Sequence, residues 1–189
     1  RWITKGKAGV PQEIGLPVCV LEDRHGFLLA SNVMVEGTDV DVALDIVETA
    51  KADFPELSSC SFDKGFWSPD NFEKLERELD LVVMPKKGGR SQAERERESA
   101  PEFVAGKRRH AAVESAINAL ENHGLDRCPD RSIIGFKRYV SLAVLARNIQ
   151  KLGALIQHQE LVQAKRTKAI KDGLRKKRIR EASELRPAA

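Results

Sequence analysis

Cysteine is scarce in this chain of 189 residues, and Cys19, Cys60 and Cys128 stand far apart. Three isolated thiols form neither a Cys-x-x-Cys pair nor the even-numbered set of a disulfide framework, and no histidine lies at metal-ligand spacing from them. The sequence therefore predicts a reduced protein of the cytoplasm, in which these cysteines are structural.

Long apolar runs and repeats are also lacking. No run approaches the roughly 18 to 20 residues that span a bilayer, and the N-terminal residues have no signal-peptide layout, so we expect neither membrane insertion nor secretion. No repeat period and no sustained heptad is present, which argues against a solenoid or a coiled coil. With 41% hydrophobic and 32% charged residues, the chain is expected to form one globular domain with a tail.

Charge is distributed unevenly. Residues 1–105 hold 13 Lys or Arg against 20 Asp or Glu, whereas residues 106–189 hold 19 against 8. Nine of the 16 residues from Lys165 to Arg180 are basic and only Asp172 is acidic, a density that attracts polyanions by counterion release. Nucleic acid is the partner this pattern favours, and a solvated helical tail is the alternative.

The order of predicted elements alternates strands and helices. After a loop-like stretch around residues 5–11, we expect a hairpin over 18–35, a helix from Asp39 to Pro55, a strand over 59–62, a helix from Pro69 and a strand over 81–84. An exposed insertion over 85–106, a helix over 109–120 carrying Glu114, and a long helix over 139–156 follow. The fold class expected is α/β, an RNase H-like mixed sheet with helical cover whose first strand lies upstream of Arg1, with a long C-terminal helix and a basic tail.

One motif stands where the third of these strands ends. The run Phe62-Asp63-Lys64-Gly65-Phe66 resembles the "DxGY/F" motif around the second acidic residue of insertion-sequence DDE transposases. Downstream, the segments 110–120, 123–128, 135–139 and 142–148 resemble the C-terminal part of ISNCY-type transposases, so the resemblance covers nearly the whole chain.

The resemblance implies a catalytic site of three carboxylates on two divalent metal ions, Mg²⁺ or alternatively Mn²⁺. Asp63 and Glu114 match the second and third acids, and the first would lie on the missing strand. Read without the resemblance, Asp63 is a turn residue and Glu114 a surface residue of a helix. Asp23, at the hairpin turn, is a less favoured alternative metal ligand.

Basic residues near this site and in the tail are the DNA-binding candidates. The family arginine position falls on His110, next to Arg109, and the lysines of the site face have an equally good reading as solvated residues. Trp67 is a candidate for base stacking or for a hydrophobic anchor. The full set is Lys64, Lys86, Lys87, Arg109, His110, Lys165, Arg166, Lys168, Arg175, Lys176, Lys177 and Arg178.

The predicted organisation is a partial catalytic domain over 1–160 and a basic tail over 161–189. The resemblance implies cleavage and strand transfer of an insertion sequence, with double-stranded DNA (terminal inverted repeats and target) as partner, a homodimeric parent protein and a prokaryotic, nucleoid-associated location. Two alternatives stay open: a DNA-binding remnant without catalysis, and another RNase H-like nuclease.

Overall fold

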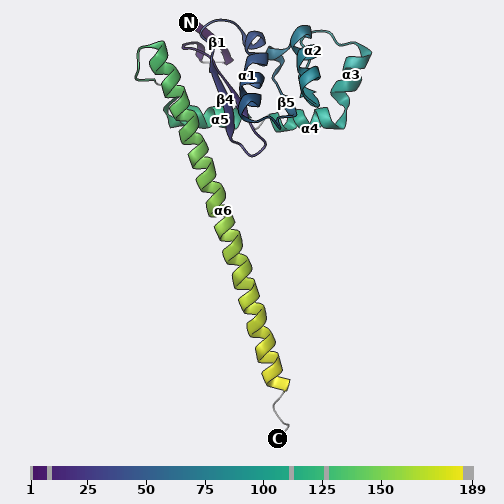
Figure 1. Ribbon diagram of the computed structural model, residues 1–189, viewed down its shortest axis with the longest axis vertical. Coiled ribbons are helices and arrows are strands. Elements are labelled where there is room, and N and C mark those ends of the chain that lie inside the picture. The colour runs from purple at the N-terminus through teal and green to yellow at the C-terminus, as the bar shows by residue number, and fades with distance from the viewer. Residues whose placement is uncertain (1, 8–9, 111–112, 126–127, 185–189) are drawn as a thin grey trace. The chain divides into compact units, whose positions relative to one another are not determined.

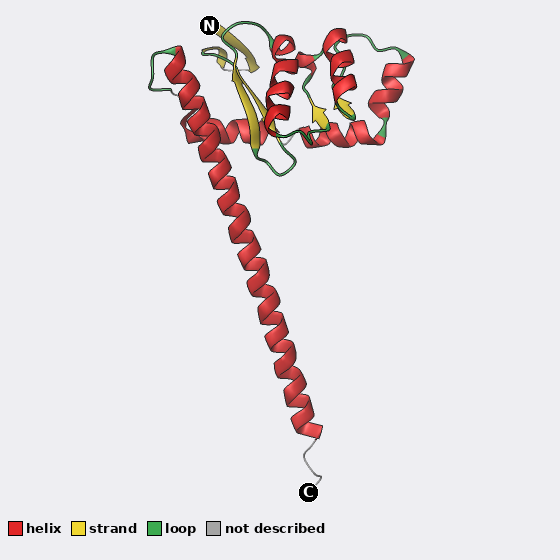
Figure 2. Cartoon of the chain, viewed as in Figure 1, coloured by secondary structure: helices red, strands yellow, loops and turns green. Residues whose placement is uncertain are grey.

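The computed structural model describes residues 2–7, 10–110, 113–125 and 128–184 (Figure 1). The chain divides into two compact units, residues 1–148 and residues 149–189. Helices make up most of the described residues, and the strands are short (Figure 2). No helix among the described residues is both long and apolar enough to cross a membrane.

The first unit begins with a hairpin where the sequence predicts a loop. Strands β1 (Trp2–Lys7) and β2 (Val10–Ile14) pair antiparallel, with Trp2 opposite Ile14 and Thr4 opposite Gln12. The prediction of a loop around residues 5–11 is therefore wrong. Glycine and lysine have low strand propensity, but they do not prevent pairing when a neighbouring antiparallel segment supplies the hydrogen bonds.

The next hairpin and helix agree with the sequence pattern. Strands β3 (Val18–Glu22) and β4 (Leu28–Val33) pair antiparallel, and inward positions such as Leu21 and Ala30 are buried. Helix α1 (Asp39–Asp53) starts at Thr38, where Asp41 completes a capping box. Its apolar stripe is buried, so α1 covers one face of this hairpin.

A parallel strand pair carries the motif at Asp63. Strand β5 (Ser59–Ser61) pairs with β6 (Leu81–Val83), and between them lie the 3-10 turn η1 (Lys64–Phe66) and helix α2 (Pro69–Glu78). Ser68 caps α2 and Pro69 occupies its first turn, as its sequence predicts.

The strands form three two-stranded sheets, β1–β2, β3–β4 and β5–β6, where the sequence predicts one mixed sheet. Among the described residues no ladder joins β3 to β5, so both are edge strands. The pairs β3–β4 and β5–β6 nevertheless share one hydrophobic core with α1 and α2. Its buried residues are Cys19, Leu21, Ala30, Met34, Val42, Ala43, Ile46, Val47, Ala50, Phe62, Leu75, Leu79, Val82 and Met84.

The helices after β6 differ from the sequence prediction in three ways. The stretch 85–106 is not wholly exposed, because helix α4 (Pro101–His110), after α3 (Gln92–Ser99), buries Phe103 and Gly106. The helix expected over 109–120 is described as α4 and a separate α5 (Val113–Leu120), which continues into a π-helical turn, Glu121–Leu125.

Helix α6 is the third difference, since it runs from Ile133 to Glu184 rather than from 139 to 156. Its Ala143 and Val144 pack with Leu28 and Leu120 in a second, smaller core of the first unit. Beyond this core the helix contains many residues of high helix propensity, such as Lys, Arg, Gln, Leu and Ala. No proline interrupts it between Ile133 and Glu184.

Candidate active site

Asp63 lies directly after β5, at the carboxyl end of the parallel strand pair. The strand's hydrogen bonding continues to Phe62, whose N–H donates to the Val83 carbonyl over 2.9 Å, and the Phe62 side chain is buried. Asp63 itself is exposed, and its Oδ1 accepts a hydrogen bond from the Lys64 N–H at 2.7 Å. The backbone thus fixes one carboxylate oxygen of Asp63 at the surface.

Two residues that the sequence pattern does not single out support the turn after Asp63. A Cβ built on Gly65 would lie 2.5 Å from Asp39 Oδ2, so the Asp39 carboxylate at the start of α1 stands against the turn. The buried Asn71 side chain donates to the Val40 carbonyl over 2.7 Å and to the Phe66 carbonyl over 3.3 Å. Asn71 therefore ties η1 to α1, and no local signal reveals this pairing.

His110 connects the helical part of the motif to the same strand. Its Nδ1 lies 3.1 Å from Ser61 Oγ, two residues before Asp63. Arg109 is exposed. Glu114 belongs to α5, and its side chain lies outside the described part of the structure. The structure therefore brings the end of α4 to the Asp63 strand, while the position of the Glu114 carboxylate stays a prediction.

The three lysines of the site region differ in their surroundings. Lys64 and Lys87 are exposed, whereas the Lys86 ammonium is paired with Glu94 at 2.6 Å and lies 5.5 Å from the centre of the Trp67 ring. Hydrogen bonds from Lys86 and from the Ser91 backbone lower the pKa of Glu94 to about 2. Lys86 is thus engaged within the protein, and Trp67 is a half-buried support for it.

Asp23 is used by its own turn. Its Oδ1 accepts hydrogen bonds from the backbone N–H groups of His25 and Phe27, each at 2.8 Å. Gly26, with φ of 84°, makes this tight turn possible. The carboxylate therefore has a local structural task in the hairpin.

Cys19 and Cys60 are unsuited to thiolate chemistry. Burial raises the pKa of both Cys19 and Cys60 to about 12, so both side chains are neutral thiols at physiological pH.

Within the described residues, no group of three or more His, Cys, Asp or Glu side chains could hold a metal ion.

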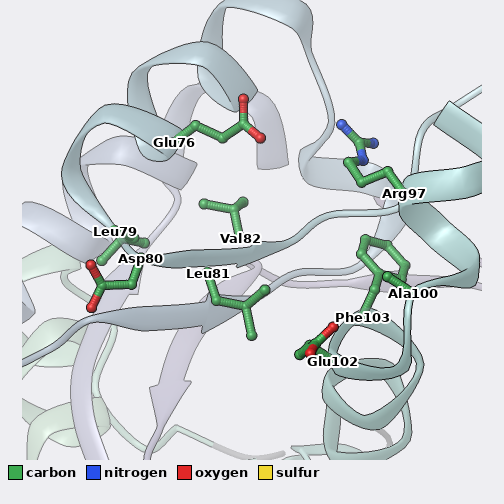
Figure 3. Close-up of a pocket in the computed structure, with 9 residues that line it drawn as sticks. All are labelled: Glu76, Leu79, Asp80, Leu81, Val82, Arg97, Ala100, Glu102 and Phe103. Carbon is green, nitrogen blue, oxygen red and sulfur yellow. The ribbon is translucent and has the colours of Figure 1, made fainter. Parts of the chain in front are cut away.

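A pocket of about 350 Å³ lies away from Asp63 (Figure 3). It opens at Asp80 and Leu81, where β6 begins, whereas Asp63 follows the carboxyl end of the parallel β5. Arg97 lines it and stacks on Phe72, 4.0 Å from the ring centre. The pocket is therefore at the opposite end of the strand pair from the motif.

The basic candidates of the tail lie on α6. The side chains of Lys165, Arg166, Lys168, Arg175, Lys176 and Lys177 are exposed, and that of Arg178 lies outside the described part. The sequence alone identifies these basic residues, and the structure adds that all of them belong to one continuous helix.

Comparison with known proteins gives one match. The model of the transposase DDE domain family matches residues 3–149, which include Asp63, His110 and Glu114. No curated protein and no solved structure matches the chain. Because the match covers well over half of its residues and includes the strand, turn and helices described above, the chain belongs to the transposase DDE domain family.

Proposed function

We propose that this chain is the larger part of an insertion-sequence transposase catalytic domain, which cleaves DNA at the element ends and joins the freed 3′-hydroxyl to target DNA. The observation that carries the proposal is the hydrogen bond of His110 with Ser61, which ties the helices leading to Glu114 to the strand that ends at Asp63. The family match across this region supports the same assignment.

Asp63 and Glu114 are the proposed ligands of the metal ions. DDE transposases use divalent metal ions such as Mg²⁺, and carboxylate oxygens are the hard donors that Mg²⁺ prefers. When bound in a pair, such ions polarise the attacking and leaving oxygens of the phosphoryl transfer. The Lys64 N–H orients the Asp63 carboxylate. Asp39, beside Gly65, adds negative charge at the same edge.

The first acid is proposed to lie on a further strand between β3 and β5, in the RNase H-like arrangement. Both are edge strands, and both contribute to one core. Cys60 on β5 packs against the core that includes Cys19 on β3, which supports placing the two edges beside one gap. In this proposal the chain is an N-terminally truncated part of the enzyme.

Duplex DNA is the proposed substrate, as terminal inverted repeats and as target. Lys64 follows Asp63 in the chain, Lys87 comes after β6 and Arg109 lies in the last turn of α4; all three are exposed and are proposed to contact phosphates. The basic part of α6 would bind the duplex through its phosphates alone. The parent protein is proposed to act as a homodimer.

The test is metal-dependent cleavage by a parent protein that includes the proposed preceding strand. Asp63→Asn and Glu114→Gln should each reduce Mg²⁺-dependent cleavage to background, because each removes one charged ligand while conserving volume. Circular dichroism should show an unchanged fold.

Asp23→Asn is the matched control. Its side-chain oxygen still accepts the two turn hydrogen bonds, so cleavage should stay within a few fold of wild type. Loss of cleavage in folded Asp23→Asn equal to that of Asp63→Asn would make Asp23 the ligand instead. DNA binding by the parent without any metal-dependent cleavage would identify a remnant and refute the proposal.

A further inference from the structure

Asn71 is a buried polar residue on the apolar side of α2. It is 5% exposed, and no other polar or charged residue in the described part of the chain is as buried. One turn further along α2, Leu75 is fully buried in the main core. Burying an amide costs free energy unless its polar groups are paired, so packing alone would favour a leucine at position 71. The amide therefore calls for a reason other than packing.

That reason is found in the groups that the amide contacts. Its Nδ2 donates to the Val40 carbonyl of α1 over 2.7 Å and to the Phe66 carbonyl of η1 over 3.3 Å. Both acceptors are carbonyl oxygens, so a side chain with two N–H donors is needed to pair with both. Because Asn71 lies in the first turn of α2, one side chain joins the starts of α1 and α2 to the turn that follows Asp63.

The same turn also lies in close contact with α1. A Cβ on Gly65 would lie 2.5 Å from Asp39 Oδ2, and Asp39 directly precedes Val40 in the chain. Within the turn, the Lys64 N–H donates to Asp63 Oδ1 over 2.7 Å. A shift of the turn away from α1 would therefore move the N–H group that orients the Asp63 carboxylate.

We propose that Asn71 is a positioning residue for Asp63. By fixing η1 against α1, its amide holds the Asp63 carboxylate in the orientation that binds a divalent metal ion. The inference rests on the proposed function, in which Asp63 is a metal ligand, and deepens it. Loss of a group that orients a metal ligand typically costs about 10- to 100-fold in metal affinity or activity. Asn71 itself contacts neither metal nor DNA in this proposal, so its whole effect passes through the turn.

Hydrogen exchange of backbone amides in the full chain, measured by NMR, is the first test and needs neither metal nor DNA. Asn71→Leu keeps the approximate size of the side chain and removes both donors. The amides of Lys64, Phe66 and Trp67 donate within the turn and should exchange roughly 5- to 10-fold faster than in wild type, because a supporting hydrogen bond is lost. The amide of Val47, in the middle of α1, should exchange at an unchanged rate.

The second test is the Mg²⁺ requirement of cleavage by the parent protein. Asn71→Leu should raise the Mg²⁺ concentration that gives half-maximal cleavage by about 10-fold or more. Its affinity for duplex DNA should stay close to that of wild type. An asparagine with a purely structural role would instead change the urea midpoint of unfolding and leave the Mg²⁺ requirement as it is. If Asn71→Leu does not fold, Asn71→Ala provides both measurements.

Ser68→Ala is the matched control at the start of the same helix. The Ser68 hydroxyl accepts a hydrogen bond from the Asn71 N–H over 3.1 Å, and it takes no part in the bonds to the Val40 and Phe66 carbonyls. Its loss should lower the stability of the protein, because an N-cap is removed. Amide exchange in the turn and the Mg²⁺ requirement should both stay close to wild type.

Three results would overturn the inference. These are turn amides that exchange at the wild-type rate in Asn71→Leu, faster exchange with an unchanged Mg²⁺ requirement, and equal effects of Asn71→Leu and Ser68→Ala on that requirement. Failure of the proposed function has a different signature, because the wild-type parent would then bind DNA without metal-dependent cleavage. The metal role of Asn71 would fall with it, whereas the exchange rates would still show whether Asn71 holds the turn.

Discussion

At the scale of single residues, the Asn148 side chain forms the pair of hydrogen bonds that a neighbouring strand would otherwise make with Leu28. Its Nδ2 donates to the Leu28 carbonyl and its Oδ1 accepts from the Leu28 N–H, both at 2.9 Å. One amide therefore satisfies both polar groups of a residue that is only 3% exposed. This pair attaches the proximal part of α6 to the start of β4.

Asn148→Ala should lower the free energy of unfolding by about 2–3 kcal/mol, because two hydrogen bonds are lost and the Leu28 backbone groups are left without partners. Urea denaturation of the full chain measures the change. Asn118→Ala, at an exposed asparagine of α5, should change stability by less than about 0.5 kcal/mol. An equal effect of the two substitutions would contradict the role of Asn148.

The sequence predicts the position of a residue well where that position depends on its neighbours along the chain. The β-prone residues 59–62 and Gly65 predict that Asp63 ends a strand, and the structure confirms that position. The partners of Asn71 and Asn148 could not be predicted, because they lie 31 and 120 residues away along the chain. Only the folded arrangement brings these groups together.

At the scale of elements, the packing of α4 on β6 depends on one glycine. A Cβ on Gly106 would lie 2.5 Å from Val83 Cγ2, inside the distance that real side chains keep. Val83 is 2% exposed and β-branched, so it has little freedom to move away. The close approach sets the position of the helix that carries His110.

Gly106→Ala should therefore destabilise the protein by about 1–3 kcal/mol, since overpacking outweighs the gain of about 1 kcal/mol in helix propensity. Thermal or urea unfolding measures it. Gly89→Ala, where a Cβ meets nothing within 4 Å, should leave the midpoint nearly unchanged.

A double substitution sharpens this test. Val83→Ala leaves a cavity by itself, but combined with Gly106→Ala it makes room for the new methyl group, so the two costs should be clearly less than additive. Strict additivity would show that the two residues do not share this contact.

Element boundaries followed the same local rule. The hairpin β3–β4, helices α1 and α2, and strands β5 and β6 agree with their periodicity and caps. The hairpin β1–β2 was missed, because its glycine- and lysine-rich sequence lacks a strand pattern. The length of α6 was underestimated, since its polar distal half has no apolar stripe to reveal it.

At the scale of the whole molecule, acidic and basic residues separate along the chain. We expect the basic segment of α6 to supply most of the sequence-independent DNA affinity. Deleting residues 165–189 should weaken binding to a random duplex and flatten its salt dependence, because each lost phosphate contact removes about 0.9 from the slope of log K against log salt. Fluorescence anisotropy at several salt concentrations measures both quantities.

Lys87→Gln is the control for this deletion, since it removes one exposed charge at the proposed site and should change the slope by about one at most. Unchanged affinity and slope after the deletion would refute a role of the basic segment in DNA binding.

The sheet shows where sequence patterns stop being sufficient for the whole molecule. They predict the strands β3 to β6 but not how the strand pairs join across the molecule, and the structure has three separate pairs in place of one mixed sheet. Pairing of β3 with β5 would need either direct hydrogen bonds, which the described residues do not make, or a strand between them.

The continuous helix through Lys165–Arg180 also fixes a length scale on DNA. Sixteen residues at about 1.5 Å each extend roughly 24 Å, which is about 7 base pairs of B-form duplex. That stretch carries about 14 phosphate charges, against nine basic residues on the helix. One helix therefore leaves part of the duplex charge uncompensated over its own footprint, and the same few base pairs have electrostatic room for a second helix on another face.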